Sequence, residues 1–233
     1  SRNALIGDSI VRLLKFNGYK TEVHYYVNDI GKQIAMLVLA ANGKKPRFHD
    51  LIKIYININK KLEKDQSIEK KVFELLNKLE KGSKKVRKQF NDIVEICVKG
   101  QSSILEELGI KYDAFDYESK YLFNKDCENL LKELAKTGKL FTDNENRQVL
   151  DLREYLPEES AYFVLTRADG TSLYGLRDLS YTIYKIYKAK DRNIIVLGED
   201  QKLYFSQLKA ALKLLNYKAP EIVHYSFVLL QEE

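Results

Sequence analysis

A short apolar run that ends in glycine and leads into an amphipathic segment most constrains the fold of this chain. Residues 193–198 are Asn-Ile-Ile-Val-Leu-Gly, and residues 203–215 carry apolar side chains at helical spacing. Such a run is typical of a central parallel strand, which is buried on both faces. Residues 23–27 alternate in a strand-like pattern, and a helix is expected over residues 33–41. This order predicts an α/β sheet whose ligands bind at the carboxyl ends of its strands.

Other segments show equally local patterns. Residues 3–16 place apolar side chains on one face of a predicted helix. A further helix is expected to end before Gly138, and another is expected to begin close to Asp178. Residues 161–166 are apolar and β-prone, and Ala168-Asp169-Gly170 predicts a hairpin turn into a second strand over residues 171–174. A last strand is expected over residues 222–230.

Residues 60–110 form a region of different character, with two apolar helical stripes. The stripes consist of Ile68, Val72, Leu75, Leu76 and Leu79, and of Val86, Phe90, Ile93, Val94 and Cys97. Gly82-Ser83 lies between them, with Ser83 suited to cap the second helix, so a helical hairpin is predicted. Residues 60–88 contain eleven basic and five acidic residues, which carry the net excess of positive charge. This basic face either contacts a polyanion or is only a solvated surface.

Composition excludes several functional classes. No run approaches the roughly 20 apolar residues that a membrane span needs, and no secretory leader precedes the first helix, although a cut N-terminus would hide one. Cys97 and Cys127 cannot form a disulfide framework, and we expect reduced thiols in the cytosol. His24, His49 and His224 show no metal-ligand spacing, so no zinc site is expected.

Four polar residues are candidate ligand-binding groups. Gln201 follows the predicted strand at residues 193–198, and Tyr174 and Asp178 lie at the start of a predicted helix, whose dipole would favour an ionised carboxylate. Glu118 stands in a Glu-Ser pair. Residue type alone leaves an ordinary alternative for each. Asp178 would cap a helix and Tyr174 would be a packed aromatic. Gln201 would be a surface residue and Glu118 a solvated carboxylate.

The segments around these residues resemble those of class I arginyl-tRNA synthetases. Residues 166–178 (TRADGTSLYGLRD) and 194–201 (IIVLGEDQ) are similar to the amino-acid pocket of that family, and residues 23–33 (VHYYVNDIGKQ) to its YVND-x-G-x-Q segment. Residues 1–8 (SRNALIGD) are similar to the stretch that follows the family's HIGH signature. The resemblance is weakest at residues 60–110.

In that family, an LY-x-x-RD segment, a G-x-x-Q segment and the acid of an E-S pair hold the substrate. The arginine-binding residues implied here are Glu118, Tyr174, Asp178 and Gln201; Asn28, Asp29, Gln33 and Gly198 would line the active site. A guanidinium group is planar, permanently charged and carries five N–H donors, so two carboxylates and a neutral acceptor would select it over an ammonium group.

The resemblance also implies a fold, a reaction and partners. The fold is an α/β class, Rossmann-like nucleotidyl-transferase domain with a helical insertion, and the reaction is ATP-dependent joining of arginine to tRNA-Arg. ATP is then a substrate, Mg²⁺ accompanies it, and a cytoplasmic monomer with no membrane contact is expected. The segments implied are 1–59 and 161–233 for the two halves of the catalytic domain, 60–110 for the insertion and 111–160 for a connecting region.

The chain departs from the family pattern in several places. Ile30, Leu176 and Tyr204 stand where tryptophan, threonine and histidine are common, which affects nucleotide contacts more than the arginine pocket. The HIGH and KMSK-type motifs and the anticodon-binding domain are missing, so the chain reads as an interior piece with no catalytic residue of its own and negligible adenylation activity alone. Two other functions stay open: a non-catalytic module that binds arginine or RNA, and, less favoured because a cation suits the acidic pair, another class I synthetase.

Overall fold

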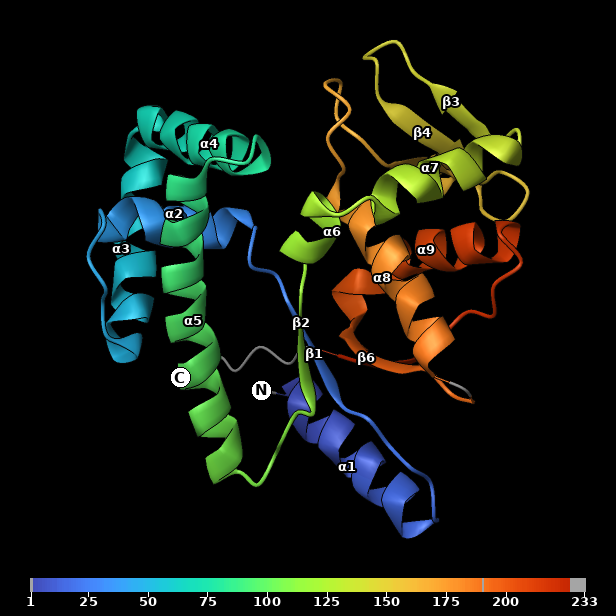
Figure 1. Cartoon of the computed structure of the whole chain (residues 1–233), viewed down its shortest axis with the longest axis horizontal. Coiled ribbons are helices and arrows are strands. Elements are labelled where there is room, and N and C mark those ends of the chain that lie inside the picture. Colours follow the sequence, from blue (N-terminus) through green and yellow to red (C-terminus); the bar gives the residue numbers. More distant parts are fainter. Residues whose placement is uncertain (1, 190, 227–233) are drawn as a thin grey trace, which may run out of the picture. The chain divides into compact units, whose positions relative to one another are not determined.

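The computed structural model describes residues 2–189 and 191–226 of the 233-residue chain. The chain divides into two compact units (Figure 1). The helical unit is Glu22–Phe123, and the split unit combines residues 1–21 with residues 124–233. The helical unit therefore interrupts the split unit in sequence.

The helical unit is dominated by four helices around one apolar core. Its elements are β1 (His24–Val27), α2 (Lys32–Ala41), the 3₁₀ turn η1 (Phe48–Asp50), α3 (Leu51–Lys64), α4 (Gln66–Glu80), α5 (Lys84–Glu107), β2 (Ala114–Tyr117) and α6 (Ser119–Phe123). Helix α2 contacts α3, α4 and α5. Ala35, Val72 and Phe90 are almost fully buried in the shared core. The apolar stripes of these helices therefore find their partners within the unit.

The predicted helical hairpin is present as α4 and α5. The Asp65 side chain caps α4 by accepting the backbone N–H of Ser67 at 2.8 Å. Gly82, with φ of +79°, follows the end of α4 in the left-handed conformation that glycine adopts most readily. Ser83 occupies the N-cap position of α5 as expected, but its side chain makes no capping hydrogen bond. The turn between the two helices therefore depends on Gly82 after α4 and not on a side-chain cap of α5.

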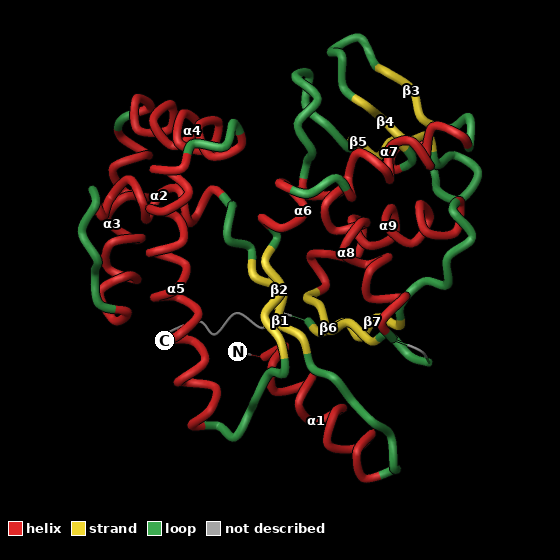
Figure 2. Tube along the Cα trace, in the orientation of Figure 1, coloured by secondary structure: helices red, strands yellow, loops and turns green. Residues whose placement is uncertain are grey.

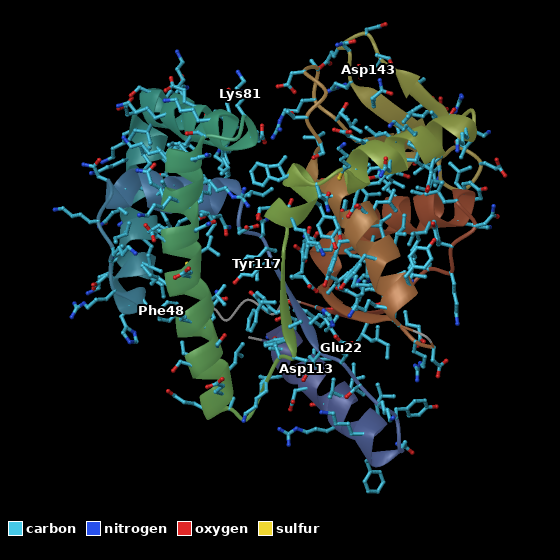
Figure 3. All side chains as sticks on the ribbon, in the orientation of Figure 1. Glu22, Phe48, Lys81, Asp113, Tyr117 and Asp143 are labelled. Atoms are coloured by element: carbon cyan, nitrogen blue, oxygen red, sulfur yellow. The ribbon has the colours of Figure 1, made fainter. Side chains whose placement is uncertain are left out.

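Helix α5 packs against η1 through a position that only glycine can occupy. A Cβ added at Gly100 would lie 2.1 Å from a ring carbon of Phe48, far inside van der Waals contact (Figure 3 labels Phe48 beside α5). The Phe48 ring thereby lies directly against the α5 backbone. The close approach fixes the loop between α2 and α3 onto the core.

The split unit combines helices with two small sheets (Figure 2). Its elements are α1 (Arg2–Phe16), α7 (Asp126–Lys136), β3 (Leu140–Thr142), β4 (Gln148–Asp151), η2 (Glu158–Ser160), β5 (Tyr162–Val164), α8 (Tyr174–Lys188), β6 (Ile194–Gly198), η3 (Glu199–Gln201), α9 (Lys202–Leu214) and β7 (Glu221–Tyr225). Strands β6 and β7 are parallel, whereas β3, β4 and β5 form an antiparallel sheet. Helix α8 contacts both α7 and α9, and α1 contacts β6.

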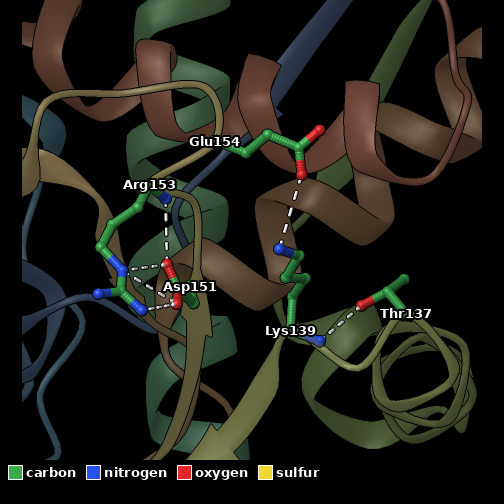
Figure 4. Close-up of polar contacts among 5 residues, drawn as sticks. All are labelled: Thr137, Lys139, Asp151, Arg153 and Glu154. Carbon is green, nitrogen blue, oxygen red and sulfur yellow. Dashed lines mark hydrogen bonds and ion pairs between the residues drawn. The ribbon is translucent and has the colours of Figure 1, made fainter.

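The turn after β4 is held by a forked ion pair (Figure 4). The guanidinium group of Arg153 donates from Nη2 and Nε to Asp151 Oδ2 at 2.6 and 3.1 Å. The backbone N–H of Arg153 also donates to Asp151 Oδ1 at 3.0 Å. These bonds lower the pKa of Asp151 to about 2, since they favour the ionised carboxylate.

Most of the elements predicted from the sequence are confirmed. The predicted helix 3–16 is α1, the two predicted strand–helix units are β1–α2 and β6–α9, the helix before Gly138 is α7, and residues 161–166 contain β5. Of the predicted last strand, β7 is described to Tyr225, and the part beyond residue 226 lies outside the described residues.

One predicted strand is wrong. Residues 171–174 form no strand: a single antiparallel bridge joins Thr166 to Ser172, and Tyr174 already begins α8. The turn itself is present, with Gly170 at φ +82°. The backbone N–H of Leu173 donates to Leu165 O at 2.8 Å, so the chain pairs briefly with the residues that follow β5 before α8 begins.

Two further observations concern the described part of the chain as a whole. None of its helices is long and apolar enough to cross a membrane. Cys97 and Cys127 are both free thiols. The division into four segments that is expected from the sequence stays a prediction, because the structure divides the chain into two units only.

Candidate active site

In the split unit, the start of α8 carries two of the predicted arginine-binding residues. Tyr174 is the first residue of the helix and is 59% exposed, whereas Asp178, one turn later, is partly buried. Gly175 between them lies against the ring of Phe163 on β5, where an added Cβ would be 2.7 Å from ring carbons. This contact fixes the start of α8 against the antiparallel sheet, and thereby positions the side chains at the start of the helix.

Asp178 binds a residue that the sequence analysis did not include in the site. The hydroxyl of Tyr204, on α9, donates to Asp178 Oδ2 at 2.9 Å. The ring of Tyr204 also packs against that of Tyr174, with 5.1 Å between centroids. In the sequence Tyr204 stands out only as a departure from the family pattern, and no local pattern indicates that it contacts Asp178. The structure thus brings Tyr174, Asp178 and Tyr204 together.

Burial controls the ionisation of Asp178. Burial raises the pKa of the carboxyl above the ordinary aspartate value, while the charge of Lys185 and hydrogen bonding by Tyr204 and Thr182 act in the opposite direction. The sequence-based expectation that the helix N-terminus favours the ionised form is therefore outweighed. Since Asp178 is the fifth residue of α8, it lies past the first turn, where the helix dipole acts most strongly. A cationic ligand would restore the ionised form.

Gly198 and Gln201 follow β6, at the carboxyl end of a parallel strand. Gly198 is buried and precedes the 3₁₀ turn η3, whose last residue is Gln201. The side chain of Gln201 is exposed, and its Nε2 donates to Asp200 Oδ2 at 2.9 Å. Gln201 is therefore engaged with its neighbour in sequence rather than with Asp178.

The other predicted site residues belong to the helical unit, at the ends of β1 and β2. These strands are parallel, so their carboxyl ends share one edge, and Glu118 directly follows β2 (Figure 3 labels Tyr117 at the end of β2). The backbone N–H of Glu118 donates to Val27 O at 3.0 Å, and the residue is only 3% exposed. The strand pairing therefore fixes where this carboxylate lies.

Asp29 is the residue that joins the two strand ends. Its Oδ1 accepts the backbone N–H of Ser119 at 2.9 Å, at the start of α6. Burial raises the pKa of Asp29, and the hydrogen bonds from Ser119 and the charge of Arg87 partly oppose this. Asp29 thus holds the Glu118–Ser119 turn against the end of β1.

Asn28 and Gln33 are both exposed. Asn28 folds back over the following turn, since a Cβ added at Gly31 would lie 2.6 Å from its Oδ1. The structure thereby brings Asn28, Asp29 and Glu118 to one edge of the β1–β2 pair. Gln33 lies at the second residue of α2.

No group of three or more histidine, cysteine, aspartate or glutamate side chains suited to a metal ion occurs among the described residues.

Comparisons with known proteins define the family. Residues 1–233 match the family described as tRNA synthetases class I (R), catalytic domain. The arginine–tRNA ligases of Methanocaldococcus jannaschii and Methanocella arvoryzae are each 39% identical over 99% of this chain. The chain spans 42% of the length of each of these relatives.

Solved structures agree on the fold. The arginyl-tRNA synthetase of Thermus thermophilus superposes with a TM-score of 0.74 at 22% identity, covering 97% of this chain and 45% of that one. The enzyme of Plasmodium falciparum gives 0.75 at 20% identity, covering 98% and 40%. The fold is thus the α/β catalytic fold of a class I aminoacyl-tRNA synthetase, and the Rossmann-like class predicted from the sequence is confirmed. The chain belongs to the family of class I arginyl-tRNA synthetase catalytic domains.

Proposed function

We propose that this chain is part of an enzyme that uses ATP to join arginine to tRNA-Arg. The observation that carries the proposal is the match of the whole chain to the arginine-specific class I catalytic domain. The names of the relatives, arginine–tRNA ligases, support the same reaction.

The reaction needs no protein nucleophile. The carboxylate of arginine attacks the α-phosphate of ATP and pyrophosphate leaves. A hydroxyl at the 3′ end of the tRNA then attacks the carbonyl carbon of the activated arginine, and AMP leaves. Positioning and stabilisation of charge do the work in such a reaction. ATP is a substrate, and Mg²⁺ would enter with its phosphates, which supply the oxygen ligands that this ion prefers. Within this chain we assign residues to the binding of arginine and none to catalysis.

Four residues are proposed to bind the arginine side chain. Asp178 and Glu118 supply carboxylates to its N–H groups, Gln201 supplies a neutral acceptor, and Tyr174 contributes its ring and hydroxyl. The partial burial of Asp178 and the almost complete burial of Glu118 support the proposal, because a buried carboxylate gains most from a fixed cationic partner. Lysine, a point charge with three rotating donors, would satisfy such acceptors less well.

Four further residues are proposed to shape the site: Asn28, Asp29, Gln33 and Gly198. Asp29 acts through the turn that carries Glu118, and Gly198 ends β6 where the chain turns towards Gln201. The exposure of Asn28 and Gln33 leaves both available to a ligand.

The basic surface of the helical unit is proposed to contact tRNA. All eleven lysine and arginine side chains between Lys60 and Lys88 are exposed. Contacts of this kind release counterions from the phosphate backbone, so the affinity should fall steeply with salt. We also propose that the protein is a cytoplasmic monomer; the two free thiols support a reducing compartment.

Calorimetric titration of the chain with arginine and lysine tests the proposed pocket. We expect arginine to bind and lysine to bind at least about tenfold more weakly, as expected when fork-shaped recognition is lost. Asp178→Asn and Glu118→Gln should each weaken arginine binding, while Glu159→Gln, an exposed carboxylate on η2, should not. Equal affinity for the two amino acids, or no binding of arginine, would contradict the proposal.

A charge-reversal experiment tests the tRNA surface separately. The triple variant Lys84→Glu, Lys85→Glu and Lys88→Glu should weaken tRNA binding and reduce the salt dependence by about 2–3 in log–log slope. The matched control reverses three exposed lysines of the split unit, Lys132, Lys136 and Lys209. If both triple variants lose tRNA equally, the basic segment has no special role.

A further inference from the structure

Tyr204 is placed to act on both α8 residues of the site. It is the third residue of α9, and its hydroxyl donates to Asp178 Oδ2 at 2.9 Å. Its ring packs against that of Tyr174, and against those of Phe163 and Phe205 at centroid distances of 6.1 and 5.4 Å. The aromatic contacts hold the ring from several sides, so the position of the hydroxyl is fixed by packing.

A fixed donor on one carboxylate oxygen restricts the orientation of the carboxylate. Each oxygen of an ionised carboxylate has two lone pairs, so a bond from Tyr204 leaves acceptor sites on both oxygens. The forked geometry of a guanidinium group requires the plane of the carboxylate to align with the plane of the guanidinium group, so that both oxygens accept N–H bonds. A carboxylate that rotates freely would have to lose that freedom when the ligand binds, which weakens binding.

We propose that Tyr204 is a positioning residue that orients Asp178 and so sets the preference of this site for a guanidinium group over a neutral group of the same shape. The inference rests on the proposed function, in which Asp178 binds the arginine side chain. Lys185 also favours the ionised form of Asp178, from the same helix, and its ammonium group lies 4.4 Å from the centre of the Tyr181 ring. Tyr204 therefore contributes chiefly geometry, because a positive charge already acts on the carboxylate.

Tyr204→Phe tests the proposal, because it removes the hydroxyl and keeps the ring. The affinities of the chain for arginine and for citrulline, its uncharged isostere, are measured by calorimetry. We expect the arginine affinity to fall on the order of tenfold, the effect of losing one hydrogen bond to a charged group. Citrulline binding should change by no more than about twofold, because a neutral ligand gains less from an oriented carboxylate. The ratio of the two affinities should therefore fall.

A matched control removes a tyrosine hydroxyl elsewhere in the split unit. Tyr217→Phe breaks the hydrogen bond of 3.0 Å between Tyr217 and Tyr187. It should leave both affinities, and their ratio, unchanged. General weakening of the fold by loss of a hydroxyl would instead lower arginine and citrulline binding together.

The outcomes separate this inference from the proposed function. If the unmodified chain does not bind arginine, the proposed function fails and takes the inference with it. If the chain binds arginine and Tyr204→Phe leaves the arginine-to-citrulline ratio unchanged, the inference fails and the proposed function stands.

If Tyr204→Phe does not fold, the unmodified chain with ¹³Cζ-labelled tyrosine provides the test. Saturation with arginine must then shift the resonance of Tyr204 and leave that of Tyr217 in place. A Tyr204 resonance that does not respond to arginine would overturn the inference.

Discussion

Asp29 in the helical unit is buried and Asp178 in the split unit is partly buried, and their hydrogen bonds hold different parts of the molecule. Burial raises the pKa of both carboxyls. Asp29 accepts a backbone N–H, that of Ser119, and thereby joins two chain segments. Asp178 accepts the hydroxyl of a side chain, Tyr204. The Asp29 bond holds together the chain at the ends of β1 and β2, whereas the Tyr204 bond holds the carboxylate of Asp178 at the proposed arginine site.

Asp178→Asn is expected to have the largest effect, which is a loss of arginine affinity. Replacing one carboxylate oxygen with an N–H₂ group removes the charge and sets a donor against the donors of the guanidinium group. We expect the arginine affinity to fall on the order of a hundredfold, in line with truncating one partner of a buried charge pair. Calorimetry measures the affinity, and thermal unfolding should show a melting temperature that is unchanged or raised. A variant that unfolds more readily would assign Asp178 to the fold.

Asp29→Ala is the counterpart in the helical unit. It leaves the Ser119 N–H without its acceptor, so we expect a loss of about 1–3 kcal/mol in the free energy of unfolding. Urea denaturation monitored by circular dichroism measures this loss. Asp29→Asn keeps an acceptor oxygen and should cost less than the alanine variant. If Asp29→Ala leaves the unfolding free energy unchanged and abolishes arginine binding, Asp29 acts on the ligand and not on the fold.

Lowering the pH should separate ligand binding from stability. A carboxyl whose pKa is raised in the folded protein is disfavoured in its ionised form, and this penalty disappears as the pH falls through the folded pKa. Acidification therefore costs the fold nothing at Asp178 or Asp29. It protonates Asp178 at higher pH than an exposed aspartate, and arginine binding should weaken by up to about tenfold per pH unit below the folded pKa.

Calorimetry with arginine between pH 7 and pH 4, alongside thermal unfolding at each pH, checks this. The control ligand is citrulline, whose binding should depend less on pH. An arginine affinity that is constant down to the pH at which the chain unfolds would show that Asp178 does not hold the ligand.

The resemblance to a known family singles out Asp178 as a candidate ligand-binding residue, but it does not indicate the hydrogen-bond partner of Asp178. Helical periodicity and the order of motifs are local properties, so α1, α4, α5 and α9 could be predicted from them. The Asp178–Tyr204 bond joins two helices and residues 26 positions apart, and its existence depends on how α8 packs on α9. No local pattern contains that information.

In helix α3 a local pattern favours a structure that the chain does not adopt. Ile52, Ile54, Ile56 and Ile58 alternate with polar or aromatic residues, a period of two that favours a strand. The segment is nevertheless helical, with Ile58 buried while Ile52 and Ile56 are 69% and 45% exposed. Contacts of α3 with α2 and α4 decide the outcome over intrinsic preference.

The smallest effect, on the stability of the fold, is expected at Asp151, whose pKa is lowered and not raised. Arg153 lowers the pKa of Asp151 to about 2, so this ion pair stabilises the fold above the ordinary aspartate pKa and loses that contribution as the pH falls towards 2. Because Arg153 is exposed, Arg153→Ala should lower the melting temperature only slightly at pH 7 and by less still near pH 2. Arginine binding should not change. Urea denaturation allows a direct comparison with Asp29→Ala. An equal loss of unfolding free energy would show that an exposed ion pair can stabilise the fold as much as a buried bond to the backbone, and the contrast between Asp29 and an exposed pair would then lose its physical basis.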